Sequence, residues 1–153
     1  MNVDCYSLED FIKKTKLCFV ATVNSDGSPN LSPKASLEVW DQNHVVFAHI
    51  DSFKTIENLA SRPKTVLNIV DFLKRKGIRL DGEATTCYPG SPEYDFIAQP
   101  IWQNHGRQYP VHCAVKIKVH SMSPLLSPAY RYGADTTEKN LAEHFLTYYK
   151  DQL

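Results

Sequence analysis

The stretch "DSFKTIENL" brings two hydroxyl groups and an ammonium group together, at Ser52, Thr55 and Lys54. Asp51 or Ser52 can cap a helix that runs to about Ala60, and the three side chains then crowd its first turn. The unpaired backbone N–H groups and the positive dipole end of a helix already favour an anion at that place. The pattern predicts a site for a phosphate monoester, and an ordinary helix cap with a solvated lysine is the alternative.

A second stretch, "LSPKAS", interrupts a segment that otherwise alternates like a strand. Pro33 cannot donate to a β-ladder, so it fits only at an edge strand or a bulge. Backbone groups near it then remain available to polar atoms of a planar ligand, and Lys34 adds a mobile cation. A simple bulge that bends the strand around a barrel corner is the alternative. In a hairpin meander the two stretches lie at neighbouring strand ends, which favours one ligand with a phosphate and a polar ring.

Two basic residues are weaker candidates for the same site. Lys76 and Arg79 flank Gly77 near the start of a strand. A basic group there could reach the ligand, or it could lie in solvent like most charges at turns. His49 follows an apolar strand, and we interpret it as a core residue rather than as an acid or a base.

Bulk properties exclude several classes of function. The chain has 153 residues and a formal net charge of zero, so no bulk field attracts nucleic acid or an anionic membrane. No apolar run approaches the ~20 residues of a membrane span. The polar, acidic N-terminus lacks the apolar segment of a signal peptide. We therefore expect a cytoplasmic protein that binds neither nucleic acid nor membrane.

The cysteine and histidine spacings do not match a metal site. Cys5, Cys18, Cys87 and Cys113 are scattered, and the six histidines include no H-x-x-x-H or H-E-x-x-H arrangement. A chain of this size does not need disulfide bonds to fold. We expect no metal and reduced, mostly buried thiols.

Strand and helix patterns follow one another along a single domain, residues 1–153, without a linker or a repeat. Six or seven strands, mostly in sequential hairpins with short helices at the breaks, predict a mainly β fold with peripheral helices. We expect closure into an antiparallel barrel, because closure removes exposed edges. The expected strands lie within residues 17–35, 36–50, 64–72, 77–88 and 109–122.

Helices are expected within residues 7–14 and 51–60 and from about 135 onward. Ser7 with Asp10 forms a loose capping box for the first, and Asp135 with Glu138 caps the last. Between residues 89 and 110 the pattern is weaker. Ser91 followed by Pro92 favours a helix start, and Pro100 should kink or end that helix.

Taken together, these segments resemble the pyridoxamine 5'-phosphate oxidase-like family of FMN-binding split barrels. The resemblance covers roughly the first hundred residues. Its motifs, in order, are a D-G hairpin with a P-N-x-S-P-K return, S-x-K-T before N-L, R-P-K-x-V, and K-G-x-R-x-x-G. The resemblance implies a split antiparallel β-barrel of the FMN-binding type.

The resemblance also implies a homodimer with two FMN sites at the subunit interface. The residues it implies around the phosphate, with the last in support, are Ser52, Lys54, Thr55 and Asn58. Those implied along the isoalloxazine edge are Pro33, Lys34, Ala35 and Ser36. Those implied to approach from an adjoining strand, of this subunit or of its partner, are Lys76, Gly77 and Arg79.

The leading hypothesis for function is an FMN-dependent oxidoreductase that acts on a small molecule. The flavin would supply the chemistry, and Lys34 near the pyrimidine edge would stabilise negative charge on it. Vitamin B6 oxidation is not expected. Compared with true pyridoxamine phosphate oxidases, the chain is shorter and lacks both the C-terminal segment that grips the substrate phosphate and an arginine on the second strand. The alternatives are a non-catalytic flavin carrier or electron-transfer protein, an interaction protein without a cofactor, and a haem-binding relative.

Overall fold

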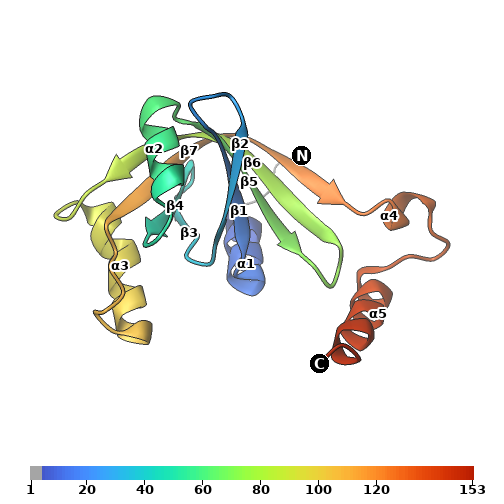
Figure 1. Cartoon of the computed structure of the whole chain (residues 1–153). Coiled ribbons are helices and arrows are strands. Elements are labelled where there is room, and N and C mark those ends of the chain that lie inside the picture. The colour runs from blue at the N-terminus through green and yellow to red at the C-terminus, as the bar shows by residue number, and fades with distance from the viewer. Residues whose placement is uncertain (1–4) are drawn as a thin grey trace.

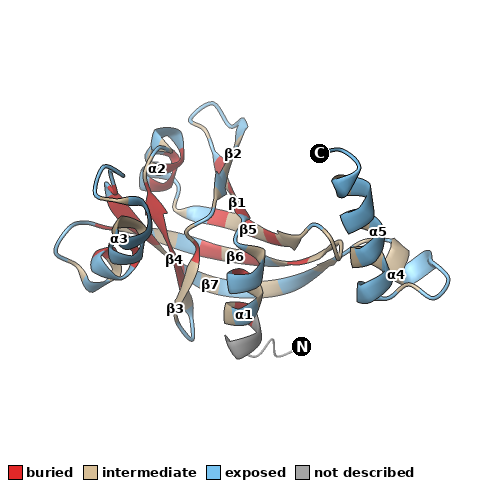
Figure 2. Cartoon of the chain, turned by 90° about the horizontal axis from the view of Figure 1, so that it is seen from below, coloured by how far each residue is buried: buried red, intermediate tan, exposed pale blue. Residues whose placement is uncertain are grey.

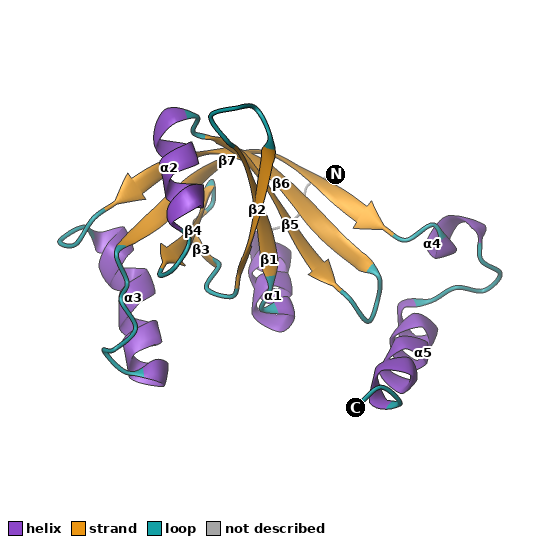
Figure 3. Cartoon of the chain, in the orientation of Figure 1, coloured by secondary structure: helices purple, strands orange, loops and turns teal. Residues whose placement is uncertain are grey.

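Five helices and seven strands make up the part of the chain that the computed structural model describes, residues 5–153, with side chains from Leu8 onward (Figures 1 and 3). The helices are α1 (Cys5–Thr15), α2 (Phe53–Ser61), α3 (Pro92–His105), α4 (Ala129–Tyr132) and α5 (Glu138–Lys150). The strands are β1 (Cys18–Val23), β2 (Pro29–Lys34), β3 (Glu38–Asp41), β4 (His44–His49), β5 (Lys64–Asp71), β6 (Lys76–Cys87) and β7 (Cys113–Leu126).

The strands form one antiparallel sheet in the order β2-β1-β5-β6-β7-β4-β3. The long strand β7 turns the sheet, because its first half pairs with both β4 and β6 while its second half continues along β6. The register with β7 shifts between Asp81 and Gly82, because His120 has no Cα partner on β6; this extra residue is a bulge in β7, and bulges bend strands. An added Cβ at Gly82 would lie 2.5 Å from the carbonyl oxygen of Lys118, so the close approach of the two strands requires glycine.

The barrel is split along one side. β2 and β3 are the two edges of the sheet, and no hydrogen bonds pair them with each other in the described chain. The prediction of a mainly β, split antiparallel barrel with peripheral helices is confirmed. The expectation of full closure was wrong, because the ladder stays open between these two edge strands.

The described side chains form two apolar clusters, and β4 contributes to both. Val45 and Phe47 point into the larger cluster inside the barrel, whereas Val46 and Ala48 point to the opposite face of the strand. The side chain of Phe47 is fully buried. α1 packs on the larger cluster, while α3 covers the smaller one through side chains such as Ile97. The buried stretches in Figure 2 follow the strands of the sheet.

Two helix starts differ from the expectation. α1 begins at Cys5, so Ser7 lies inside the helix and cannot be its N-cap. α5 is capped by Thr137, whose side chain accepts a hydrogen bond from the backbone N–H of Asn140, and the amide of Asn140 completes a capping box. Asp135 instead adopts a left-handed backbone conformation with φ 53°, two residues before the cap.

The uncertain stretch before β7 contains α3. Ser91 caps this helix as predicted, and its side chain accepts a hydrogen bond from the backbone N–H of Tyr94. Pro100 does not end the helix, which continues to His105. Pro100 is exposed on the surface of α3, so its ring does not displace a core side chain.

The C-terminal residues form an arm away from the barrel (Figures 1 and 2). α5 has no buried residue. The arm is held at the turn between β5 and β6, where the Arg75 guanidinium lies 3.7 Å from the centre of the Phe145 ring and donates to the Tyr149 hydroxyl at 3.0 Å. The hydroxyl of Tyr130 also donates to the carbonyl oxygen of Lys74 at 2.6 Å.

The packing predicts which apolar residue holds the barrel together. Phe47→Ala removes a fully buried ring and should lower the free energy of unfolding by about 3–5 kcal/mol. Leu31→Ala, at a position 63% exposed on the outer face of β2, should change it by less than about 0.5 kcal/mol. Urea unfolding followed by circular dichroism measures both, and equal effects would contradict the assigned core.

Candidate functional site

The split between β2 and β3 opens into a groove of about 910 Å³, within the size range of small-molecule sites. Both edge strands line it, together with the segment that follows β4, the charged face of α1 and one face of α3. The contribution of α3 is apolar at Phe96, Ile97, Pro100 and Ile101 and polar at its C-terminal end, at Asn104 and His105. The groove therefore offers an apolar wall opposite a polar rim.

Residues 33–36 line the groove as one continuous segment. Pro33 lies in the edge strand β2, opposite Phe19 of β1. An edge strand tolerates proline because one of its sides has no ladder to complete. The strand ends at Lys34, and the Ser36 hydroxyl oxygen then accepts the backbone N–H of Ala48 at 3.0 Å. This bond fixes the end of β2 to β4.

Lys34 places a half-buried ammonium group in the groove. Its Nζ donates to the Ser32 hydroxyl at 2.7 Å and to the carbonyl oxygen of Pro33 at 3.3 Å, and lies 5.7 Å from the centre of the Phe47 ring. Burial lowers the pKa of Lys34, and the charge of Asp51 opposes that effect. Among the described residues no carboxylate lies within ion-pair distance of this ammonium group. A negatively polarised ligand atom would supply the missing partner.

The N-terminus of α2 lies next to the groove. Asp51 lines the groove, and Ser52 occupies the N-cap position without a side-chain bond to the helix backbone. The Ser52 hydroxyl lies 3.2 Å from Nδ1 of His49 instead. The ammonium group of Lys54 is exposed and forms an ion pair with Glu57 at 2.8 Å. A surface pair of this kind is weak and can be exchanged for a ligand anion.

Thr55 and Asn58 are buried behind the groove and belong to a hydrogen-bond network. The Asn58 amide donates to the Thr22 hydroxyl at 3.0 Å and to the side-chain oxygen of Asn24 at 2.8 Å. The Asn30 amide donates to the hydroxyls of Thr22 and Thr55, at 3.0 and 3.2 Å. These bonds fasten α2 to the β1–β2 hairpin, so both predicted residues support the helix within this chain.

Lys76, Gly77 and Arg79 lie outside the groove of their own chain. Lys76 forms an ion pair with Glu138 of the C-terminal arm, and the Nε atom of Arg79 donates to Asn68 at 3.2 Å. Arg79 shares a row across the sheet with Pro33, three strands away, which is roughly 14 Å at ordinary strand spacing. Gly77 has a packing reason, since an added Cβ would lie 2.3 Å from the carbonyl oxygen of Ile69.

The sequence interpretation missed a cluster of rings beside Ser52. The His49 ring is 4.9 Å from the Phe53 ring and 5.1 Å from the His112 ring, measured between centroids. Burial lowers the pKa of His49, and so do the nearby charges of His112 and Lys34. The signal was available, because only Ile50 separates His49 from the "DSFK" segment, but its apolar neighbours indicated a core position.

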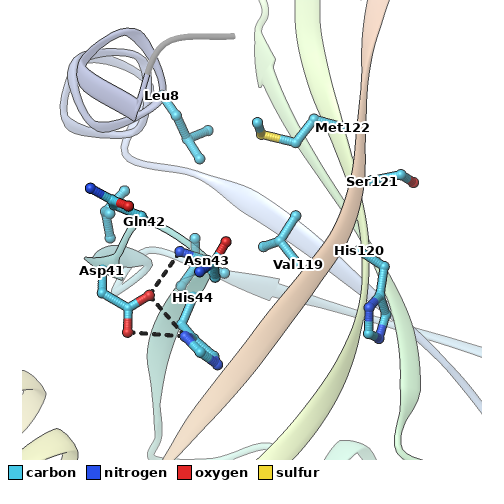
Figure 4. A pocket seen from close by; sticks show the side chains of 11 residues that line it. Leu8, Asp41, Gln42, Asn43, His44, Val119, His120, Ser121 and Met122 are labelled. Atoms are coloured by element: carbon cyan, nitrogen blue, oxygen red, sulfur yellow. Dashed lines mark hydrogen bonds and ion pairs between the residues drawn. The ribbon is translucent and has the colours of Figure 1, made fainter. Parts of the chain in front are cut away.

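A smaller hollow of about 190 Å³ lies at the β3–β4 turn (Figure 4). There the carboxylate of Asp41 pairs with His44 and accepts the backbone N–H of Asn43, while Val119 and Met122 provide an apolar side. None of the predicted site residues lines this hollow.

Within the described residues, no group of three or more histidine, cysteine or carboxylate side chains could hold a metal ion. Cys18, Cys87 and Cys113 are buried free thiols. Burial raises the pKa of Cys18 to about 12 and that of Cys113 to about 11, so neither is a reactive thiolate at neutral pH. No helix in residues 5–153 is long and apolar enough to cross a membrane.

The fold and the groove agree with a match to a known family. Residues 7–126 match the sequence pattern of the family described as pyridoxamine 5'-phosphate oxidase. This range covers well over half of the chain, so the protein belongs to that family, and the resemblance seen in the sequence is confirmed. No curated protein sequence matches the chain.

Solved structures with the same fold include several bacterial proteins. HupZ from Group A Streptococcus is 27% identical, with 80% of this chain and 94% of that chain covered and a TM-score of 0.68. An FMN-binding protein from Syntrophomonas wolfei is 18% identical, with 76% and 82% covered and a TM-score of 0.68. HutZ, the heme storage protein from Vibrio cholerae, is 17% identical, with 82% and 95% covered and a TM-score of 0.58. At these identities, the last two comparisons show the fold alone.

The buried network yields a test of what Asn58 does. Asn58→Ala removes the buried amide that donates to the Thr22 hydroxyl and to the side-chain oxygen of Asn24, so Thr22 keeps only the Asn30 donor, and it should lower the free energy of unfolding by about 1–3 kcal/mol. Glu57→Ala, the neighbouring exposed position on α2, should cost less than about 1 kcal/mol. Thermal or urea unfolding in the absence of ligand gives both values. No loss of stability in Asn58→Ala would mean that the network does not hold α2.

Proposed function

We propose that this protein is an FMN-binding oxidoreductase that acts on a small molecule. The observation that carries the proposal is the half-buried, carboxylate-free ammonium of Lys34 inside a groove that ends beside the N-terminus of α2. A flavin nucleotide has the matching chemistry, with a polar ring edge at one end and a phosphate at the other. The family of the chain supports the same ligand.

The residues divide into two groups by their role toward FMN. Ser52, Lys54 and the first backbone N–H groups of α2 would hold the phosphate, which favours a helix N-terminus with a nearby cation. Residues 33–36 would lie along the polar edge of the ring, with the ammonium of Lys34 as the charged contact. Thr55 and Asn58 would act from behind by holding α2 in place.

When bound, FMN supplies hydride or electron transfer at its isoalloxazine ring. The chain contributes the charge of Lys34, which favours whichever state of the ring carries more negative charge. The apolar wall of α3 excludes water from the opposite side of the groove. Substrate and electron donor would enter along this wall.

A homodimer is part of the proposal. Members of the family commonly dimerise, and the groove of one chain does not include Lys76 or Arg79. These two residues lie on the far strand β6, so they would reach a flavin only across a subunit interface.

The buried free thiols Cys18, Cys87 and Cys113 support a reducing compartment such as the cytoplasm.

A second candidate function is a non-catalytic carrier of a flavin or another planar cofactor. Two observations favour it: the groove is lined by the apolar face of α3 with His105 at its end, and HutZ, with the same fold, is a heme storage protein. The two functions differ in turnover. Reduction of the bound flavin by reduced nicotinamide, followed by absorbance, supports the oxidoreductase, and lack of reduction by any donor supports the carrier.

The phosphate contacts predict a difference between two flavins. The double variant Ser52→Ala, Lys54→Ala should bind FMN at least about tenfold more weakly, because each substitution removes one polar contact with the phosphate dianion. Riboflavin, which lacks the phosphate, should bind both proteins alike. Quenching of flavin fluorescence measures the four affinities. The control Lys139→Ala removes an exposed lysine from α5 and should leave FMN affinity unchanged. Unchanged FMN affinity in the double variant would mean that Ser52 and Lys54 do not contact the phosphate.

The ammonium of Lys34 predicts a shift in redox potential. Lys34→Met removes a half-buried positive charge and should lower the midpoint potential of the bound flavin by about 30 mV or more, equivalent to ~1.4 kcal/mol for a two-electron couple. Lys13→Met removes an exposed lysine from the rim of the same groove and should shift it far less. Dye-coupled titration gives both potentials. Equal shifts would indicate a general charge effect and not a contact by Lys34.

A further inference from the structure

His49 contacts both donor groups of Ser52. The Ser52 backbone N–H lies 3.3 Å from His49 Nδ1, and the Ser52 hydroxyl oxygen lies 3.2 Å from the same nitrogen. The imidazole is only 3% exposed. This buried ring therefore holds the backbone N–H and the hydroxyl of Ser52, the N-cap residue of α2.

The two contacts fix the tautomer of His49 and the direction of the hydroxyl. A backbone N–H can only donate, so Nδ1 must accept and carries no proton. Toward the hydroxyl the same nitrogen can again only accept, so Ser52 is the donor in that contact as well. In the protein without a bound anion, both protons of Ser52 are directed at His49.

This arrangement is unfavourable for a phosphate. A hydroxyl that points its proton at His49 presents lone pairs to any anion at the N-terminus of α2. If Nδ1 becomes protonated, the direction of the contact reverses: Nδ1–H donates to the Ser52 oxygen, and the Ser52 proton turns outward. The backbone N–H of Ser52 also loses its acceptor and becomes available to the anion.

Burial and the charges around His49 favour its neutral form when no anion is bound. Burial is the main cause that lowers the pKa of His49; the charges of His112 and Lys34 lower it further, and that of Asp51 raises it. The aromatic ring of Phe53 packs against its edge, and Cys113, a neutral buried thiol, lies opposite His49 in the β4–β7 register. A phosphate next to Ser52 adds negative charge to this set and raises the pKa of His49.

We propose that His49 is a positioning residue for phosphate: it takes up a proton at Nδ1 as the anion binds and thereby turns the Ser52 hydroxyl toward a phosphate oxygen. The inference rests on the FMN site proposed above. The proton comes from solvent, Ser52 keeps its own proton, and no covalent bond forms or breaks. This proton uptake favours ligands that carry a phosphate, because a ligand without the anion does not raise the pKa of His49.

The sign of the pH dependence follows from linkage. The pKa of His49 is lowered in the protein without ligand and higher beside the anion, so protons are taken up on binding at any pH between the two values. FMN affinity should therefore rise as the pH falls through this window. The affinity for riboflavin should not follow it.

The test is the number of protons taken up when FMN binds. Calorimetric titrations at pH 7 in buffers of different ionisation enthalpy give this number directly. We expect the wild-type protein to take up more protons than His49→Asn, which keeps an acceptor near Ser52 but cannot be protonated, by a difference approaching about one per chain. Proton release from the phosphate itself, with a pKa near 6, is common to both proteins and cancels. Riboflavin should cause no uptake in the wild type, a comparison that needs no variant.

His112→Asn is the matched control, because it removes the neighbouring imidazole and leaves the contact between His49 and Ser52 in place. Equal proton uptake in wild type and His49→Asn overturns the inference, as does uptake that is lost in His112→Asn but kept in His49→Asn. Inorganic phosphate separates this inference from the proposed function. Proton-coupled binding of phosphate without binding of FMN would contradict only the flavin, and binding of neither would contradict both.

Discussion

The position of α2 is the constraint on which the site depends. A short helix above a hairpin could sit in several registers, but the amides of Asn30 and of the buried Asn58 favour one, since both donate to the hydroxyl of Thr22. Leaving a buried amide without a partner costs more than a typical hydrogen bond contributes, and linked bonds of this kind favour a single arrangement. Through this network the β1–β2 hairpin decides where the N-terminus of α2 points.

The split in the barrel is the second half of the arrangement. A closed ladder would satisfy the edges of β2 and β3 but would leave no groove between them. Pro33 suits the open edge, and the bond from Ala48 to Ser36 holds the end of β2 without closing the gap. The groove that results contains the ammonium of Lys34 over an apolar core, where burial makes a positive charge costly unless a ligand compensates it. The open edge between β2 and β3 thus leaves a half-buried positive charge that a polar, negatively polarised ligand would stabilise.

The sequence revealed the elements better than it revealed the contacts between them. The Asp26-Gly27 turn and the helix start at Ser91 are set by residues within a few positions, and local turn and cap chemistry is sufficient to predict them. Ser52 also takes the predicted N-cap position of α2, although its side chain makes no bond to the helix backbone. Full closure of the barrel was predicted and is not found, because closure depends on whether the two ends of a seven-strand sheet meet. Such long-range pairing leaves no local signal.

The same limit applies to the site residues. Thr55 and Asn58 carry groups that suit a ligand, but the helix periodicity turns them toward the hairpin. The distance between Arg79 and Pro33 follows from strand order, which the sequence does not state. The contact between His49 and Ser52 spans only three positions, yet it required the backbone to bend after β4. The sequence therefore predicted which residues lie near the site where the geometry is local. What each residue does there could be read only from the fold.

The most direct test of the account is whether the groove retains a flavin. Purified protein can be saturated with FMN, passed through a size-exclusion column, and examined by its visible absorbance against its peptide content. The account predicts that flavin and chain leave the column together in equal molar amounts, in a species of dimer size. A colourless protein peak, with all of the FMN eluting as a small molecule, would contradict it.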